Sequence, residues 1–205
     1  MNIDNSNYKE RPILFTGEMV RAILCGKKTQ TRRVVKPTKD RNGSGCELAP
    51  CEIAGEINKS RNFDLSPYGK IGDRLWVRET FCPIFPQDPD YNNGEPIEYD
   101  YRADYQHGTR LGDVLGIKKI WKPSIFMPRD AARITLEITN IRVERLNDIS
   151  EEDALAEGVK KKVILDWPLI TRAAWCEFRN LWSGINGEES WDLNPWVWVI
   201  GFKRI

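Results

Sequence analysis

The chain has 205 residues, of which 40% are hydrophobic and 30% are charged. Its 31 Lys and Arg residues against 30 Asp and Glu argue against bulk electrostatic binding of long nucleic acid, but they leave room for a local basic cleft. The length predicts one domain over residues 1–205, and neither a membrane span of roughly 20 apolar residues nor a signal peptide is expected, so we predict a cytoplasmic protein without a membrane partner.

Cysteine and histidine usage gives little support for a metal site. The five cysteines are irregularly spaced, no CxxC pair occurs, and His107 is the single histidine. A structural zinc site needs four such ligands, and these usually come in closely spaced pairs. We therefore expect reduced thiols, no metal and no cofactor.

The first half of the chain predicts a helix, two strands and an insertion. Residues 17–25 place apolar side chains at helical spacing, and Gly26 is predicted to end this helix. The segment TQTRRVV (29–35) is rich in β-branched residues and predicts a strand. Residues 37–70 show little periodicity and predict an irregular insertion. Residues 72–81 predict a turn followed by a second strand.

The second half adds a further insertion, two strands and a helix. Residues 82–130 are rich in proline and tyrosine and predict a second irregular insertion. Residues 132–146 alternate apolar and polar side chains, as a long strand or a pair of strands does. Residues 167–182 predict a helix capped by Asp166, and residues 194–205 predict a closing strand. Strands outnumber helices in a mixed order, which favours an α+β fold: a small β-barrel flanked by helices, with two long irregular insertions.

The segment GKKTQTRRVV (26–35) carries four cations and two threonines. On a regular strand Thr31 and Arg33 would share one face, and Lys28 and Arg32 would share the other. Lys28 can act together with Thr31 only where the backbone turns between them, which the preceding helix end makes possible. A solvated basic strand, a nucleic-acid patch and a catalytic lysine–threonine pair all fit the composition.

A second polar segment, ISEEDALAEGV (149–159), predicts a short helix. Ser150 opens a capping-box pattern and Gly158 ends the helix. Glu157 then lies in the last turn, where a carboxylate opposes the helix dipole at a cost of about 0.3–1 kcal/mol. An exposed glutamate would tolerate this position, whereas one that faced a cleft would be a candidate proton donor or acceptor.

Together these segments resemble the ASCH domain of the PUA-like superfamily. The resemblance rests on K-T-x-T-x-R after a helix (28–33), the strand opener GDRLWVRE (72–79), the segment LNDISEEDALAEGV (146–159) and the closing strand PWVWVIGFK (195–203). RPILFTGEMVRAIL and KPSIFMPRDAARITLEI are similar to ASCH proteins common in phages and prophages. The matched parts run in family order from end to end, so the resemblance implies a single PUA-like (ASCH) β-barrel domain.

The resemblance also implies an activity. Compact bacterial ASCH proteins include amidohydrolases that cleave N4-acetylcytidine to cytidine and acetate. Their catalytic lysine, threonine and glutamate correspond to Lys28, Thr31 and Glu157 of this chain. The implied function is an amidohydrolase that acts on N4-acetylcytidine or related N4-acylcytidines. Its expected partner is a modified cytidine nucleoside or RNA, without an obligate protein partner.

Two catalytic routes are open to these three residues. In the first, the Thr31 hydroxyl attacks the acyl carbon, neutral Lys28 is the base, and Glu157 passes a proton to the leaving nitrogen. In the second, Lys28 stays charged and stabilises the oxyanion, Glu157 is the general base for a direct water attack, and Thr31 only donates a hydrogen bond. The sequence does not separate the two routes.

Four further residues are candidates for substrate binding. Arg33 is expected to hold a cytosine carbonyl or a ribose hydroxyl, with a salt bridge to an acid such as Glu79 as the alternative. Phe15 and Trp76 are candidates to stack on the base, although aromatic residues in barrel strands more often belong to the core. Arg133 would add charge to one rim of the site.

Three other functions compete with the amidohydrolase. A non-catalytic RNA-binding module would use the cations of 27–33 and KKIWKP (118–123) beside aromatic side chains. A ribonuclease of the ASCH type is also possible, although a single histidine excludes a paired-histidine mechanism. A phage accessory protein with a different substrate is the third, because the two insertions can reshape the pocket.

Overall fold

The computed structural model describes residues 8–39, 46–86, 91–105, 121–160 and 173–205. Five strands within these ranges form one mixed sheet in the order β1-β5-β8-β9-β2. They are β1 (Glu10–Leu14), β2 (Gln30–Val34), β5 (Arg74–Arg78), β8 (Thr135–Arg145) and β9 (Trp196–Arg204). β1 and β5 run parallel, and the other neighbours in the sheet are antiparallel.

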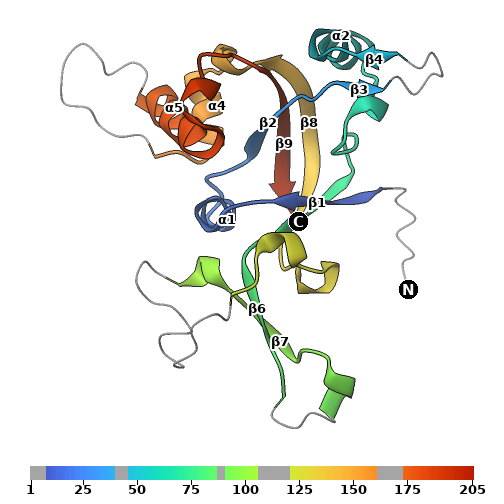
Figure 1. Ribbon diagram of the computed structural model, residues 1–205, viewed down its shortest axis with the longest axis vertical. Coiled ribbons are helices and arrows are strands. Elements are labelled where there is room, and N and C mark those ends of the chain that lie inside the picture. The colour runs from blue at the N-terminus through green and yellow to red at the C-terminus, as the bar shows by residue number, and fades with distance from the viewer. Residues whose placement is uncertain (1–7, 40–45, 87–90, 106–120, 161–172) are drawn as a thin grey trace.

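The predicted α+β class is confirmed. The long strands β8 and β9 run side by side at the centre of the sheet, as Figure 1 shows. β1 and β2 form its two edges, and no pairing between described residues joins them. The hydrogen bonds between described residues therefore leave the sheet of the predicted small barrel open between β1 and β2.

Four helices accompany the sheet in the described part of the chain. They are α1 (Gly17–Leu24), α2 (Pro50–Ser60), α4 (Glu151–Ala156) and α5 (Ala173–Asn186). The Thr16 hydroxyl caps α1 by accepting a hydrogen bond from the Met19 amide at 3.4 Å. Gly26 follows with a φ of 72°, so the predicted helix and its glycine end are confirmed.

Successive side chains of β9 point to opposite faces of the sheet, and each face carries an apolar core. Trp198, Ile200 and Phe202 belong to the main core, which α1 and α2 help to close. Val197 and Val199 point the other way and pack in a second core with side chains of α4 and α5. Figure 1 shows α4 and α5 beside one end of the sheet, with α2 on the opposite side. The second core thus fixes α4 and α5 close to β2.

The described residues of the first insertion, 37–39 and 46–70, contain more regular structure than the sequence indicates. They form the short strands β3 (Thr38–Lys39) and β4 (Glu47–Leu48) and the eleven-residue helix α2. Ile53 and Ile57, one helical turn apart, are completely buried in the main core. The Asn58 amide also bonds to both backbone groups of Val143 in β8, at 2.6 and 3.1 Å. The expectation of an irregular segment is wrong here, because these tertiary contacts stabilise a helix with weak local signals.

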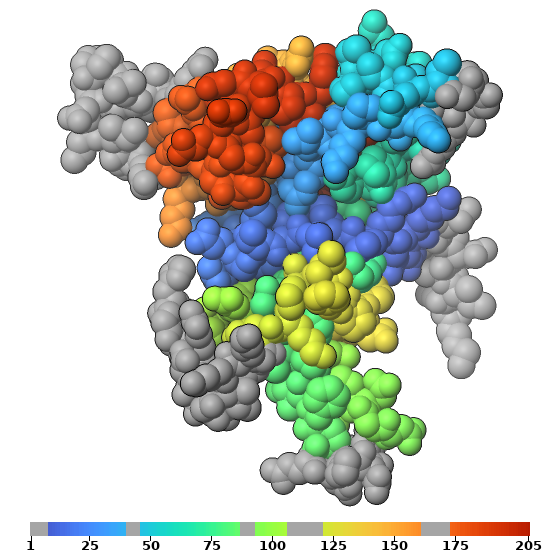
Figure 2. All heavy atoms as spheres, viewed as in Figure 1, coloured from blue at the N-terminus to red at the C-terminus, as the bar shows by residue number. Residues whose placement is uncertain are grey.

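The second insertion contains a β-ribbon and several 3-10 turns. β6 (Phe81–Ile84) pairs antiparallel with β7 (Glu98–Tyr101). The ribbon projects from the body as an arm, which Figures 1 and 2 show at the bottom of the view. The predicted helix at 167–182 is observed from Ala173 onwards and continues to Asn186, while its predicted beginning lies outside the described residues. No helix in the described ranges is long and apolar enough to cross a membrane.

Candidate active site

A buried ion pair between Lys28 and Glu157 forms the centre of the candidate site. The two residues face each other in an antiparallel bridge, and the Thr29 amide donates to the Ala156 carbonyl beside it at 2.9 Å. Lys28 Nζ donates to Glu157 Oε2 at 2.7 Å and to the Glu157 backbone carbonyl at 2.9 Å. Lys28 is 2% exposed and Glu157 is 4% exposed. The structure therefore brings together two of the three predicted catalytic residues.

Gly158 allows this close approach. It ends α4 with a φ of 88°, a left-handed conformation that favours glycine. A Cβ atom at this position would lie 2.9 Å from the Cβ of Lys28 and 3.0 Å from that of Ala22. The predicted glycine end of the helix is confirmed, and it has the second effect of leaving space for Lys28.

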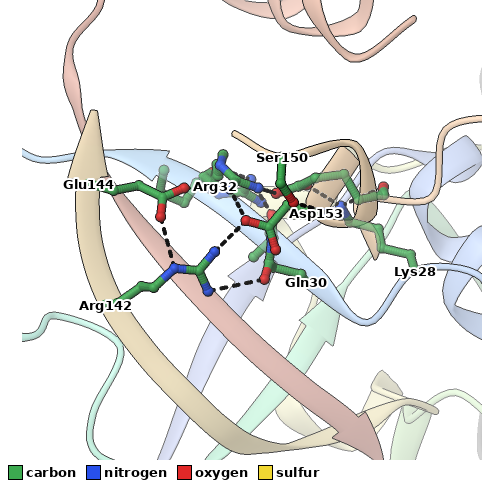
Figure 3. A network of polar contacts seen from close by, with 10 residues as sticks. Lys28, Gln30, Arg32, Arg142, Glu144, Ser150 and Asp153 are labelled. Atoms are coloured by element: carbon green, nitrogen blue, oxygen red, sulfur yellow. Dashed lines mark hydrogen bonds and ion pairs between the residues drawn. The ribbon is translucent and has the colours of Figure 1, made fainter. Parts of the chain in front are cut away.

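Arg32 holds the other oxygen of the Glu157 carboxylate. Its Nη1 donates to Glu157 Oε1 at 3.1 Å. Its Nη2 donates to Asp153 Oδ2 at 2.8 Å and to Glu144 Oε1 at 2.5 Å. Arg142 contacts the same two acids from the other side, as Figure 3 shows. Glu157 is thus fixed between two cations, and one of these belongs to a larger charge network.

Burial changes the acidity of the lysine. Loss of hydration lowers the pKa of Lys28; the Glu157 carboxylate opposes this shift, and the charges of Arg33 and Arg32 add to it. Lys28 therefore gives up its proton more readily than a solvated lysine. A lowered pKa favours the neutral lysine of the first route, and in the second route it limits the charged lysine to pH values below that pKa.

Thr31 and Arg33 lie together on one face of β2 and Arg32 lies on the other, as the strand alternation predicts, whereas Lys28 precedes the strand. Arg33 Nη1 donates to Thr31 Oγ1 at 2.8 Å and to the Arg32 carbonyl at 3.0 Å, and its Nη2 donates to the Leu14 carbonyl at 2.8 Å. Thr31 is only 1% exposed. Within the described residues, no hydrogen bond joins Thr31 to Lys28 or Glu157.

The Phe15 ring lies near both Lys28 and Arg33. Its ring centroid lies 5.8 Å from Lys28 Nζ and 5.3 Å from Arg33 Cζ. Burial lowers the pKa of Arg33, although an arginine keeps its charge at neutral pH. No carboxylate in the described ranges forms an ion pair with Arg33. A partly buried guanidinium in this position is suited to bind an electron-rich group of a ligand.

The remaining predicted binding residues lie elsewhere. Arg133 donates two hydrogen bonds to the Glu79 carboxylate, from Nε to Oε1 at 2.9 Å and from Nη2 to Oε2 at 3.1 Å. The alternative of a salt bridge between Arg33 and Glu79 is therefore wrong. Trp76 lies against Arg78, whose Cζ is 4.7 Å from the indole centroid. Neither Trp76 nor Arg133 is among the described residues that line the cavity next to Glu157. A role in substrate binding for either would require contacts outside this cavity.

A cavity of about 850 Å³ adjoins the ion pair. Glu157, Arg32, Arg33 and Phe15 are among its lining residues. Lys28 and Thr31 are not among its described lining residues and lie behind this surface. Of the predicted catalytic trio, Glu157 is therefore the residue that borders the space available to a ligand.

Two parts of the site were not predicted from the sequence. One is the role of Arg32 and its acidic partners; strand alternation placed Arg32 beside Lys28, and the four-residue spacing of Asp153 and Glu157 placed both on one helical face. The other is the apolar wall of α5. Its periodicity is equally typical of a core-facing helix, so the sequence alone contained no signal for a cavity wall.

Comparisons with known proteins give one structural similarity. No protein-family model and no curated protein matches the chain. The crystal structure of an ASCH domain from Lactobacillus crispatus JV V101 aligns over 96% of this chain and 80% of that chain, with 14% identity and a TM-score of 0.39. A similarity at this level leaves the chemistry of the site to be argued from its own residues.

Proposed function

We propose that this protein is an amidohydrolase that removes the acyl group from N4-acetylcytidine or a related N4-acylcytidine. The observation that carries the proposal is the Glu157 carboxylate, which borders a cavity of ligand size while Lys28 and Arg32 hold both of its oxygens. A fixed, buried carboxylate beside a cavity has the placement of a general base. The resemblance to ASCH amidohydrolases supports the same assignment, since their residue types stand at Lys28, Thr31 and Glu157.

We favour direct attack by water over a covalent threonine intermediate. Glu157 borders the cavity, whereas Thr31 is buried behind it and already accepts a hydrogen bond from Arg33. In this route Glu157 removes a proton from water, and the water oxygen forms a bond to the acyl carbon. The C–N4 bond then breaks, and the proton on Glu157 passes to N4. The products are cytidine and the carboxylic acid.

The cations behind Glu157 supply the stabilisation of the transition state. Before proton transfer, the carboxylate charge partly cancels the charges of Lys28 and Arg32. When Glu157 becomes protonated, this cancellation ends and the two cations act on the negative oxygen that forms at the acyl carbon. Lys28 and Arg32 have fully buried side chains, so water screens their field weakly.

Arg33 and Phe15 are suited to the pyrimidine. Three N–H groups of Arg33 are used within the protein, and we assign its remaining donors to the ring carbonyl of the base. The adjacent Phe15 ring offers an apolar contact to the base. An electron-withdrawing pyrimidine makes the amide easier to cleave than a peptide, and a cation at its carbonyl increases this effect.

The test is a spectrophotometric assay of the purified protein with N4-acetylcytidine. We expect turnover by the wild type and a loss of about 10²–10⁴-fold in kcat for Glu157→Gln. Glu152→Gln is the matched control, because Glu152 lies on the same helix but is exposed. Absence of turnover with acetyl and longer acyl groups would overturn the proposal, and RNA binding and cleavage would then be tested.

A further inference from the structure

The two arginines of β2 both line the cavity and lie against different aromatic rings. Arg33 points toward Phe15, with its Cζ 5.3 Å from the ring centroid. Arg32, its neighbour in the chain, points the other way toward Phe178 of α5, with its Cζ 5.7 Å from that centroid. Glu157 contacts Arg32 and borders the same cavity. The carboxylate therefore lies where a polar part beside Arg33 meets a second part beside α5.

The second part has an apolar wall. Phe178, Leu181, Trp182 and Ile185 recur at helical spacing on one face of α5, and all four line the cavity. Phe178 and Trp182 are anchored in the second core, which fixes the wall in position. Ile185 is 52% exposed, so this end of the wall is accessible to a ligand.

The dimensions of this wall exceed an acetyl group. Phe178 and Ile185 are seven positions apart on α5, which corresponds to about 10 Å along the helix axis. An acetyl group has a single methyl group beyond the carbonyl carbon. The cavity of about 850 Å³ is also near the upper end of the range of about 300–1,000 Å³ that is typical of small-molecule sites. Most of the α5 wall would stay uncovered with N4-acetylcytidine bound.

We infer that the α5 wall binds a long hydrophobic acyl chain, so that medium-chain N4-acylcytidines are better substrates than N4-acetylcytidine. The inference rests on the proposed amidohydrolase function. With the base beside Arg33 and Phe15 and the scissile carbonyl at Glu157, the acyl chain extends from the carbonyl toward Phe178 and the rest of the wall. An apolar chain is complementary to this surface, whereas a ribose or a phosphate is not.

The experiment measures kcat/KM for N4-acetyl-, N4-butanoyl- and N4-hexanoylcytidine with the full-length protein. Each methylene that becomes buried increases kcat/KM by up to about fourfold, so we expect N4-hexanoylcytidine to exceed N4-acetylcytidine by at least about tenfold. Leu181→Ser and Ile185→Ser should each reduce the hexanoyl-to-acetyl ratio by about fivefold. Leu193→Ser is the control, because Leu193 is 76% exposed and does not line the cavity; its ratio should equal that of the wild type.

The outcomes separate this inference from the function on which it rests. Turnover of N4-acetylcytidine without an increase for longer chains would overturn the acyl-chain site and leave the amidohydrolase in place. An increase that both serine variants retain would overturn the assignment to α5. Absence of turnover with every member of the series would overturn both proposals. The series on the wild type alone decides the preference, whatever the stability of the variants.

Discussion

Arg32 Nη1 lies 3.1 Å from Glu157 Oε1, and the arginine side chain that makes this contact is fully buried. The same guanidinium contacts Asp153, four residues before Glu157 on the same side of α4. A single buried cation thus holds two acids of one short helix. The position of Glu157 depends on Arg32 as well as on Lys28, which makes Arg32 a positioning residue for the proposed base.

Replacing Arg32 should affect both stability and catalysis. Arg32→Gln leaves three acidic side chains without their shared buried cation, so we expect a loss of about 3–5 kcal/mol in the free energy of unfolding, measured in urea. Arg129→Gln is the control, because the Arg129–Glu10 pair is exposed and its loss should cost no more than about 1 kcal/mol. Equal losses in the two variants would contradict the role of the buried network.

The activity of Arg32 variants tests whether Arg32 positions Glu157 for catalysis. Arg32→Lys keeps the charge but not the fork that reaches two acids at once. We expect it to restore part of the stability of Arg32→Gln while kcat stays about tenfold or more below that of the wild type and KM changes little. A lysine variant with wild-type kcat would show that the two-pronged guanidinium of Arg32 is not needed to position Glu157.

The loss of activity at high pH should follow the deprotonation of Lys28. In the proposed route its charged form is the active one, and burial lowers the pKa of Lys28 from its ordinary value of 10.5. Activity is therefore complete below the pKa of the buried lysine and is lost as the pH rises through it, with a midpoint below 10.5. Lys28→Arg keeps a charge in this pH range, so this limit should shift upward in a profile of kcat/KM against pH. An unchanged limit would assign it to another group.

The sequence predicted those elements whose signals are local. Gly26 marks the end of α1, Ser150 and Gly158 mark the ends of α4, β-branched residues indicate β2, and alternation indicates β8. The helix α2 was not predicted, because burial of Ile53 against the sheet contributes more than its weak local preference. Local signals are thus sufficient where the chain itself supplies the caps, and insufficient where tertiary contacts decide.

The residues of the site also differ in whether the sequence carries a local signal for their positions. Strand alternation separated Thr31 and Arg33 from Arg32 correctly, since the period of two holds through β2, which begins at Gln30 and does not include Lys28. The pairing of Lys28 with Glu157 joins residues 129 positions apart, and only the resemblance to ASCH domains indicated it. The open alternative of a salt bridge between Arg33 and Glu79 was wrong, because the fold places Arg133 next to Glu79. Contacts of this kind have no local signature.

Substitution of Thr31 distinguishes the two catalytic routes. If Thr31 only orients Arg33, Thr31→Ser should stay within about threefold of the wild type, and Thr31→Ala should lose about tenfold, mainly through a higher KM for the nucleoside. A covalent route instead requires Thr31→Ala to lose about 10³-fold or more in kcat. Intact-protein mass spectrometry during turnover supplies an independent measurement, since an acyl adduct on the wild type would contradict direct attack by water.

Two glycines of this chain should respond to alanine with opposite signs. Gly158 has a φ of 88°, and an added Cβ would meet the Cβ of Lys28 at 2.9 Å, so Gly158→Ala should lower the free energy of unfolding by about 1–3 kcal/mol. It should also reduce activity, because Lys28 must move away from Glu157.

Gly55 lies inside α2, where an added Cβ has no neighbour within 4 Å. Gly55→Ala should therefore raise the free energy of unfolding by about 0.5–1 kcal/mol and leave activity unchanged. Urea unfolding and the nucleoside assay on both variants check this, and a Gly158→Ala variant that matches the wild type in both would show that the approach of Lys28 to Glu157 needs no glycine.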